Sequence, residues 1–341
     1  MDSIRVGMGH PTAGTTPGGS GCRVDHDHPH TGHPRAMLNH GNGFLRPWTA
    51  LRCAVRRRPT VAFLVAAFVL TWIVWVPRAL VSHGVLDAPW TVELGNTWAY
   101  GPAQAAVLVA ALVGRDALRD LGRRLTRWRV SLRWYALVLL GPAAFWAVVL
   151  VVVGVLGLLG LPYDGEAAPQ PPIAALGLSA LPLLIVVILT DGLGEETGWR
   201  AFALPRLLRR LPALGASVLL GVVWACWHLP LLWTDGAMLE GASFWVLLLE
   251  LPARSLLFTW VFRATGGSAL LAILLHASMS LCTVTAAVAF ISDGRVAAVI
   301  LLAEWLLAAG LVRSASLRSR HGALDPDGEA AGTSTTPSVT A

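Results

Sequence analysis

Eight long apolar runs constrain the fold of this chain more than any other feature of its sequence. A helix needs about 17–25 apolar residues to cross a bilayer. The runs that meet this length are 60–82, 97–114, 134–160, 173–197, 213–233, 243–262, 267–290 and 295–313. Hydrophobic residues make up 55% of the chain and charged residues only 13%, which is typical of an integral membrane protein. We therefore predict an all-α, polytopic membrane protein with about eight transmembrane helices.

The arginines predict how these helices are oriented. Connections rich in arginine alternate with connections that carry acidic residues and few arginines, and the richest of them is 115–133. Because cytoplasmic loops carry the excess of positive charge, both termini are predicted to be cytoplasmic in a multi-pass protein of the plasma membrane. The leucines of 115–133 recur at helical spacing, which predicts an amphipathic helix on the inner leaflet. The net charge of +6 then reflects topology and anionic lipid, so we expect the lipid bilayer as a partner and no nucleic acid.

Two polar segments flank the apolar runs. Residues 1–59 and 314–341 are rich in small and polar residues and lack apolar periodicity, as is typical of disordered segments. The histidines of the first segment are expected to be solvated, because a flexible tract offers a metal no fixed geometry. The predicted organisation is a disordered cytoplasmic tail (1–59), a transmembrane helical domain (60–313) and a second disordered cytoplasmic tail (314–341).

Three of the apolar runs carry ionisable side chains that can form one site. Glu195 and Glu196 lie at the end of the fourth run and Arg200 just after it, His228 lies in the fifth run and His276 in the seventh. Ionisable groups inside a bilayer are costly and mark functional sites by default. We predict that these three segments form one polar site within the membrane.

Helical geometry separates the roles of the two glutamates. Neighbouring residues on a helix point about 100° apart, so Glu195 and Glu196 are not expected to share a proton. Glu196 and Arg200 are four residues apart on one face and are predicted to form an ion pair. Glu195 is then left to face the site, where a carboxylate can act as a general base on water.

Three motifs in these segments resemble those of the CPBP family of intramembrane proteases, also called the CAAX prenyl protease 2 or Abi family. The motifs are Glu195-Glu196-x-x-x-Arg200, Trp224-x-x-x-His228 and His276-x-x-x-Ser280. They fall within roughly 181–281, inside a CPBP-like core expected at about 173–290. Two residues depart from the family pattern, since Trp224 stands in place of the usual phenylalanine and Ser280 in place of the common asparagine.

The resemblance implies an intramembrane endopeptidase that hydrolyses a peptide bond with a glutamate-activated water. It implies that Glu195 activates this water with assistance from His228, and that His276 and Ser280 stabilise the oxyanion. The residues that would support the site are Glu196, Arg200 and Trp224. The resemblance also implies a site that is open toward the cytoplasm, and a peptide or protein substrate is expected to enter from the membrane or the cytoplasmic side.

Alternatives remain open for the cofactor and for the class of function. Glu195, His228 and His276 match a known set of zinc ligands, but the H-E-x-x-H motif of common zinc proteases is absent. Zinc is thus compatible with the sequence without being required by it. Chains of glutamate and histidine also occur in proton-coupled transporters, and a non-catalytic immunity or scaffold protein could keep the motif.

The positions of these residues along their runs add a structural requirement. Glu195 lies almost at the cytoplasmic end of its run, whereas both histidines lie deeper in theirs. The helix is therefore predicted to continue past Arg200 toward Pro205. Elsewhere, Glu250 and Arg254 are four residues apart and can neutralise each other.

Overall fold

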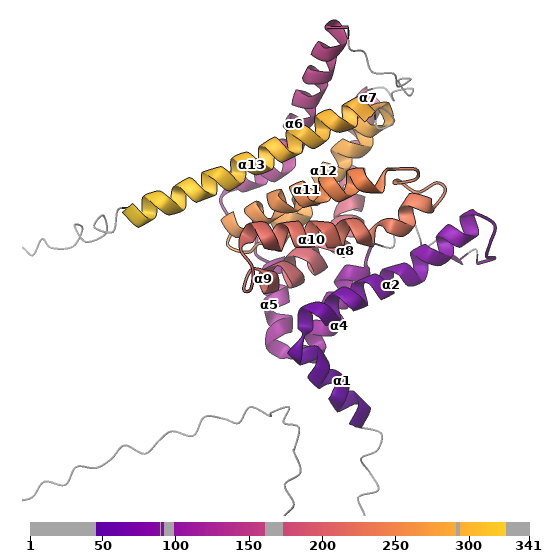
Figure 1. Ribbon diagram of the computed structural model, residues 1–341, viewed down its shortest axis with the longest axis vertical. Helices are drawn as coiled ribbons and strands as arrows, with labels where there is room; N and C mark the ends of the chain where they lie inside the picture. The colour runs from indigo at the N-terminus through magenta and orange to yellow at the C-terminus, as the bar shows by residue number, and fades with distance from the viewer. Residues whose placement is uncertain (1–45, 89, 92–98, 161–172, 291–293, 325–341) are drawn as a thin grey trace, which may run out of the picture. The chain divides into compact units, whose positions relative to one another are not determined.

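The computed structural model describes residues 46–88, 90–91, 99–160, 173–290 and 294–324 (Figure 1). The chain divides into a unit of residues 1–54 and a unit of residues 55–341, which contains the functional site. Every regular element among the described residues is helical. The helices used here are α1 (Arg46–Arg57), α2 (Pro59–Ser82), α4 (Gly101–Val113), α5 (Arg115–Leu125), α6 (Leu132–Leu158), α7 (Ile173–Val187), α10 (Ala213–Trp227), α11 (Phe244–Ala264), α12 (Ala269–Phe290) and α13 (Gly294–Leu324).

Most of the predicted apolar runs correspond to apolar helices. Within the described ranges, five helices are long and apolar enough to cross a membrane: Pro59–Ser82, Leu132–Leu158, Ala213–Trp233, Phe244–Ala264 and Ala297–Ser314. Two shorter apolar helices, Gly101–Val113 and Ala269–Thr283, lie in two further runs. The prediction of an all-α, polytopic membrane protein is thereby confirmed. The count of eight spans and the cytoplasmic termini stay predictions.

Helices extend into both segments that were predicted to be tails. Helix α1 lies within 1–59, and α13 continues past residue 313 as far as Leu324. The apolar residues of α1, including Trp48, Leu51 and Val55, recur at helical spacing, a short pattern that is easily read as polar chain. The rest of both predicted tails, 1–45 and 325–341, lies outside the described residues.

The predicted amphipathic helix at 115–133 is shorter than expected. Helix α5 ends before Trp128, and the chain that follows is fixed to the turn between α11 and α12. The Arg124 guanidinium lies 5.6 Å from the centre of the Phe262 ring, and Arg127 Nε donates to the Thr265 carbonyl at 3.2 Å. This arginine-rich segment is therefore packed against other helices as well as being rich in surface charge.

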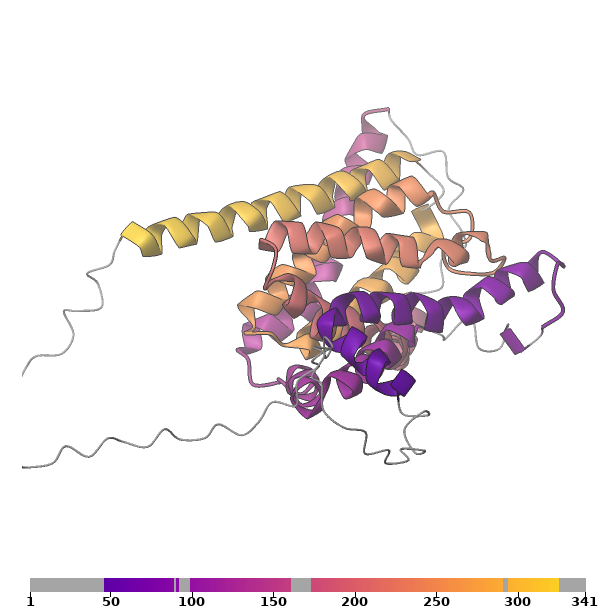
Figure 2. The ribbon, with the colours of Figure 1, turned by 60° about the horizontal axis from the view of Figure 1, so that its bottom comes forward.

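Helices α10 and α11 pack side by side and carry residues on which the site depends (Figures 1 and 2). Their close approach occurs at Gly221 of α10. A Cβ atom at this position would lie 2.6 Å from the Pro252 nitrogen and 2.8 Å from the Leu251 carbonyl oxygen. Only a residue without a side chain allows the two backbones to come this near.

Candidate active site

The two glutamates lie in the middle of a helical segment whose winding changes several times. The chain stays helical from Ile173 to Leu207, which confirms that the helix continues past Arg200 toward Pro205. The successive elements are α7, η1 (Ile188–Gly192), α8 (Leu193–Glu196), η2 (Thr197–Ala203) and α9 (Leu204–Leu207). Both η1 and η2 are π-helical. Such wide turns are rare and often occur at functional sites.

Two glycines let this segment lie directly against α4. A Cβ atom at Gly194 would be 2.6 Å from the Ala99 carbonyl oxygen, and one at Gly198 would be 2.5 Å from Pro102 Cβ. Only residues without a side chain allow the two segments to come this near. The close contact places Glu195 and its neighbours inside the protein, with Glu195 only 4% exposed.

Glu196 forms the predicted ion pair and a second bond that the sequence did not predict. Its Oε1 atom accepts from Arg200 Nη1 at 3.0 Å and from His276 Nδ1 at 2.8 Å. The Arg200 guanidinium also lies over two aromatic rings, 4.5 Å from the centre of Trp224 and 4.2 Å from that of Phe258. A fully buried charge needs such compensation. Glu196 therefore holds both Arg200 and the His276 ring in place.

Glu195 contacts different partners from its neighbour. Its Oε2 atom accepts a hydrogen bond from Trp224 Nε1 at 2.5 Å, and its Oε1 atom lies 3.9 Å from His276 Nε2. The two glutamates thus face opposite nitrogens of one imidazole, Glu196 at Nδ1 and Glu195 at Nε2. The Glu195 Oε1 atom remains available for a further partner.

His228 follows the last residue of α10, so the predicted run 213–233 is not a single α-helix. The α-helix ends at Trp227, and a 3-10 turn, η3 (Leu229–Trp233), follows. Pro230 explains this ending, because proline lacks an N–H and disfavours helical backbone in the residue before it. The His228 Nδ1 atom lies 2.9 Å from the Trp224 carbonyl oxygen. A carbonyl only accepts, so Nδ1 donates and Nε2 is the nitrogen that can accept a proton in the neutral ring.

One cavity of about 530 Å³ brings the predicted residues together. The residues of the three motifs that line it are Glu195, Trp224, His228, His276 and Ser280. Glu196 and Arg200 do not line the cavity and are fully buried behind it. The chain thus assembles all four residues that the resemblance implies to be catalytic, together with Trp224.

Three further charged residues line the same cavity, and the sequence assigned none of them to the site with certainty. They are Arg78, Asp191 and Arg254. Arg78 lies in α2 and is only 4% exposed. Its position within the apolar run 60–82 was the available signal, since an ionisable residue inside such a run is a functional candidate.

The possible zinc ligands Glu195, His228 and His276 are not arranged to hold a zinc ion. Among the residues that the structure describes, no three His, Cys, Asp or Glu side chains are grouped so that they could hold a metal ion. His276 Nδ1 is bonded to Glu196, and Glu195 Oε2 is bonded to Trp224. Glu195, His228 and His276 share a cavity but do not converge on one point as zinc ligands must.

Known proteins are similar to the part of the chain that carries these motifs. Residues 177–282 match a family model described as type II CAAX prenyl endopeptidase Rce1-like. The chain is also 26% identical over 229 residues to the CAAX prenyl protease 2 of Methanococcus maripaludis, an alignment that covers 64% of this chain and 81% of the relative. The matched range 177–282 contains Glu195, His228 and His276 of the cavity and Glu196 behind it. The chain is thus similar to CAAX-type proteases of the CPBP family over the part that carries this cavity.

Proposed function

We propose that this protein is a glutamate-dependent endopeptidase in which Glu195 is the general base that activates water. The observation that carries the proposal is that Glu195, His228, His276 and Ser280 line one cavity. Glu196, the adjacent carboxylate, is engaged by Arg200 and His276. Glu195 is therefore the carboxylate that can reach a water in this cavity.

The hydrolysis can be followed proton by proton. Glu195 Oε1 accepts a proton from water while the water oxygen bonds to the peptide carbonyl carbon. The C–N bond then breaks as Glu195 returns this proton to the leaving nitrogen, which departs as an amine. His228 Nε2 faces the cavity as an acceptor and orients the water through its second hydrogen. Glu195 ends the cycle as a carboxylate.

The tetrahedral intermediate carries a negative oxygen that needs donors already in position. In its doubly protonated form, His276 donates Nδ1–H to Glu196 and keeps Nε2–H for this oxygen. The Ser280 hydroxyl lies one helical turn further along α12 and lines the same cavity. Glu196 thereby acts as a positioning residue, because it fixes the orientation of the imidazole that stabilises the intermediate.

The substrate class is proposed from the relative in Methanococcus maripaludis, whose name describes a protease of prenylated CAAX proteins. Apolar side chains, including Leu231, Leu247 and Leu251, line much of the cavity beside the charged groups. This combination suits a peptide segment that carries a lipid group. We propose a lipid-modified peptide that reaches the site from the membrane or the cytoplasmic side of the plasma membrane.

The test is hydrolysis of an internally quenched CAAX peptide by purified protein in lipid nanodiscs, with the peptide prenylated or unmodified. Glu195→Gln and His228→Ala are expected to lower turnover by about 10²–10⁴-fold, the usual contribution of a general acid–base group. Leu302→Ala, on the exposed face of α13, should cleave at the wild-type rate. Full activity of Glu195→Gln would refute the proposed role, whereas equal cleavage of both peptides would refute only the lipid preference.

A further inference from the structure

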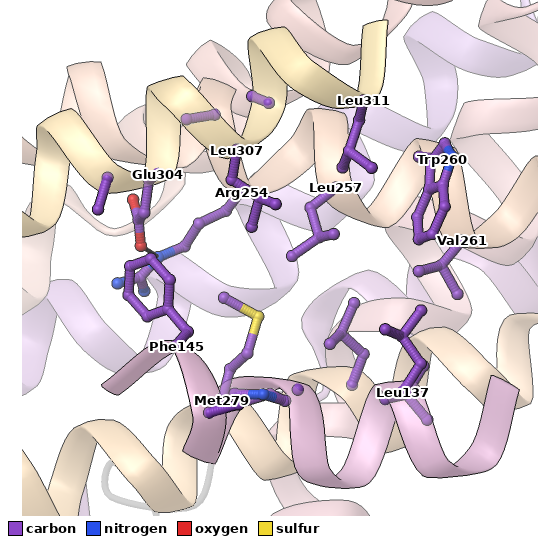
Figure 3. Close-up of a pocket in the computed structure, with 18 of the residues that line it drawn as sticks. Leu137, Phe145, Arg254, Leu257, Trp260, Val261, Met279, Glu304, Leu307 and Leu311 are labelled. Carbon is purple, nitrogen blue, oxygen red and sulfur yellow. Dashed lines mark hydrogen bonds and ion pairs between the residues drawn. The ribbon is translucent and has the colours of Figure 1, made fainter. Parts of the chain in front are cut away.

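A second cavity, of about 550 Å³, lies between α6, α11, α12 and α13 (Figure 3). Its wall is mainly apolar and includes Leu137, Phe145, Leu257, Trp260 and Leu311. The two cavities are neighbours, because both are lined by Arg254, Met279 and Thr283. Helices α6 and α13 lie outside the residues 177–282 that match the family model. Most of the residues that line this cavity therefore come from parts of the chain that the family match does not cover.

A charged cluster lies at one end of the second cavity (Figure 3). Arg254 Nε donates to Glu304 Oε1 at 2.8 Å, and Arg254 Nη2 donates to Glu250 Oε1. The pairing of Glu250 with Arg254 was predicted, whereas Glu304 joins them from a separate helix. Glu304 has a side chain only 8% exposed, and its Oε2 atom has no hydrogen-bond partner among the described residues.

The cluster lacks one positive charge and one hydrogen-bond donor. Two carboxyl groups share a single guanidinium, so both can be ionised only with a surplus negative charge at the wall of an apolar cavity. Buried charges that lack a partner are strongly disfavoured. An apolar ligand with an ammonium group would supply the missing charge and donate to Glu304 Oε2 at the same time.

Hydrolysis in the neighbouring cavity produces such a ligand. Cleavage of a peptide bond always releases one fragment with a new α-amine, and a fragment cut from a membrane-embedded segment is apolar. We propose that the second cavity is the exit site for this amine-side product, with its ammonium group bound to Glu304. The proposal rests on the proposed peptidase function. Val148 and Leu306 line the cavity and are 61% and 64% exposed, so the product has a route to the outer surface of the helices.

The test measures binding of trileucine amide, a short apolar peptide with a free α-amine, and of its N-acetylated form. Both are titrated into the full chain carrying Glu195→Gln, so that no cleavage is needed and no catalytic carboxylate competes for the amine. The free amine is expected to bind at least ten-fold more tightly than the acetylated peptide. Glu304→Gln, which keeps a carbonyl oxygen for Arg254, should bring the two affinities within two-fold of each other.

Two further variants control the interpretation. Leu302→Ala changes an exposed residue of the same helix that does not line the cavity, and it should keep the ten-fold preference. Leu307→Trp fills the cavity and should weaken binding of both peptides. If the protein that retains Glu304 binds the free amine and the acetylated peptide equally well, the proposal is overturned. A Glu304 that already carries a proton would give this result. The outcome does not depend on whether the Glu304→Gln variant folds. Such a result would leave the peptidase assay free to decide the function on its own.

Discussion

Trp224 connects more parts of the site than any other described side chain with a role in it. Its Nε1 atom donates to Glu195, and the guanidinium of Arg200 lies against its ring. The ring centre is 5.9 Å from that of His228 and 5.8 Å from that of His276. An indole in the place of the family's usual phenylalanine keeps the aromatic packing and adds a donor that fixes the carboxylate.

Trp224→Phe removes this donor while it keeps an aromatic ring. A hydrogen bond to a charged group contributes about 1.5–3 kcal/mol, so we expect kcat to fall by roughly 10–100-fold if the bond orients Glu195 for proton transfer. The measurement is turnover of the quenched peptide together with the thermal unfolding temperature. The matched control is Trp227→Phe, which removes a bond of 2.9 Å to Thr71 outside the cavity. A loss of activity that is equal in both variants would show that Trp224 acts only through packing.

The contacts of single residues divide into those that sequence spacing predicts and those that it does not. The Glu196–Arg200 pair was predictable, because both residues lie within two turns of one helix. The bonds from Glu196 to His276, from Trp224 to Glu195 and from Arg254 to Glu304 join residues that are 80, 29 and 50 positions apart. Such contacts depend on how separate helices pack, and nearly uniform apolar runs do not specify which faces meet.

The contact between α10 and α11 determines where both helices hold their site residues. Helix α10 carries Trp224, and α11 carries Phe258 and Arg254. The sequence predicted both helices, but it predicted neither the end of α10 at Trp227 nor its closest contact with α11. That contact depends on the fit of Gly221 against a proline on another helix, which spacing along the chain does not reveal.

Gly221→Ala tests the importance of this contact. The added methyl group would collide with backbone atoms of Leu251 and Pro252, and forcing such overlap into a packed interior costs about 1–3 kcal/mol. We expect a lower unfolding temperature and reduced turnover, measured on protein purified in the same detergent. Gly215→Ala on the same helix is the control, since its Cβ atom would meet only Leu211 Cβ at 4.0 Å. Equal stability of the two variants would show that the helices can separate without cost.

Across the whole molecule, the arginine-rich connections gather at one end of the unit formed by 55–341. Arg56 donates to the Leu112 carbonyl, and Arg127 to that of Thr265. Other connections meet each other instead, since the Asp235 N–H donates to Ser82 Oγ. The orientation of these connections across the membrane stays a prediction. However, residues 236–239, from the connection predicted to be non-cytoplasmic, line the cavity that holds Glu195. The family resemblance implied instead that this cavity opens toward the cytoplasm.

Labelling with a membrane-impermeant maleimide can decide between these two predictions. In a background with all native cysteines replaced by serine, one variant carries Asp235→Cys and another Arg119→Cys; both native side chains are exposed, by 55% and 74%. The positive-inside rule predicts that the cysteine at position 235 reacts in intact cells. It predicts that the cysteine at position 119 reacts only in inverted vesicles. Reaction of both from the same side would contradict the predicted topology. The reverse pattern would instead place the cavity opening toward the cytoplasm.

The π-helical turns on either side of the glutamates constrain the length of this part of the chain. A wide turn accommodates one residue more than an α-helical turn. Loss of one residue from Thr197–Ala203 could relax the backbone to a regular helix. Because the wide turn absorbs that extra residue, the helix after the deletion would keep nearly its present phase relative to Glu195 and Glu196. Shortening by a single position would thus alter the backbone beside the glutamates while it spares the packing of the helix that follows.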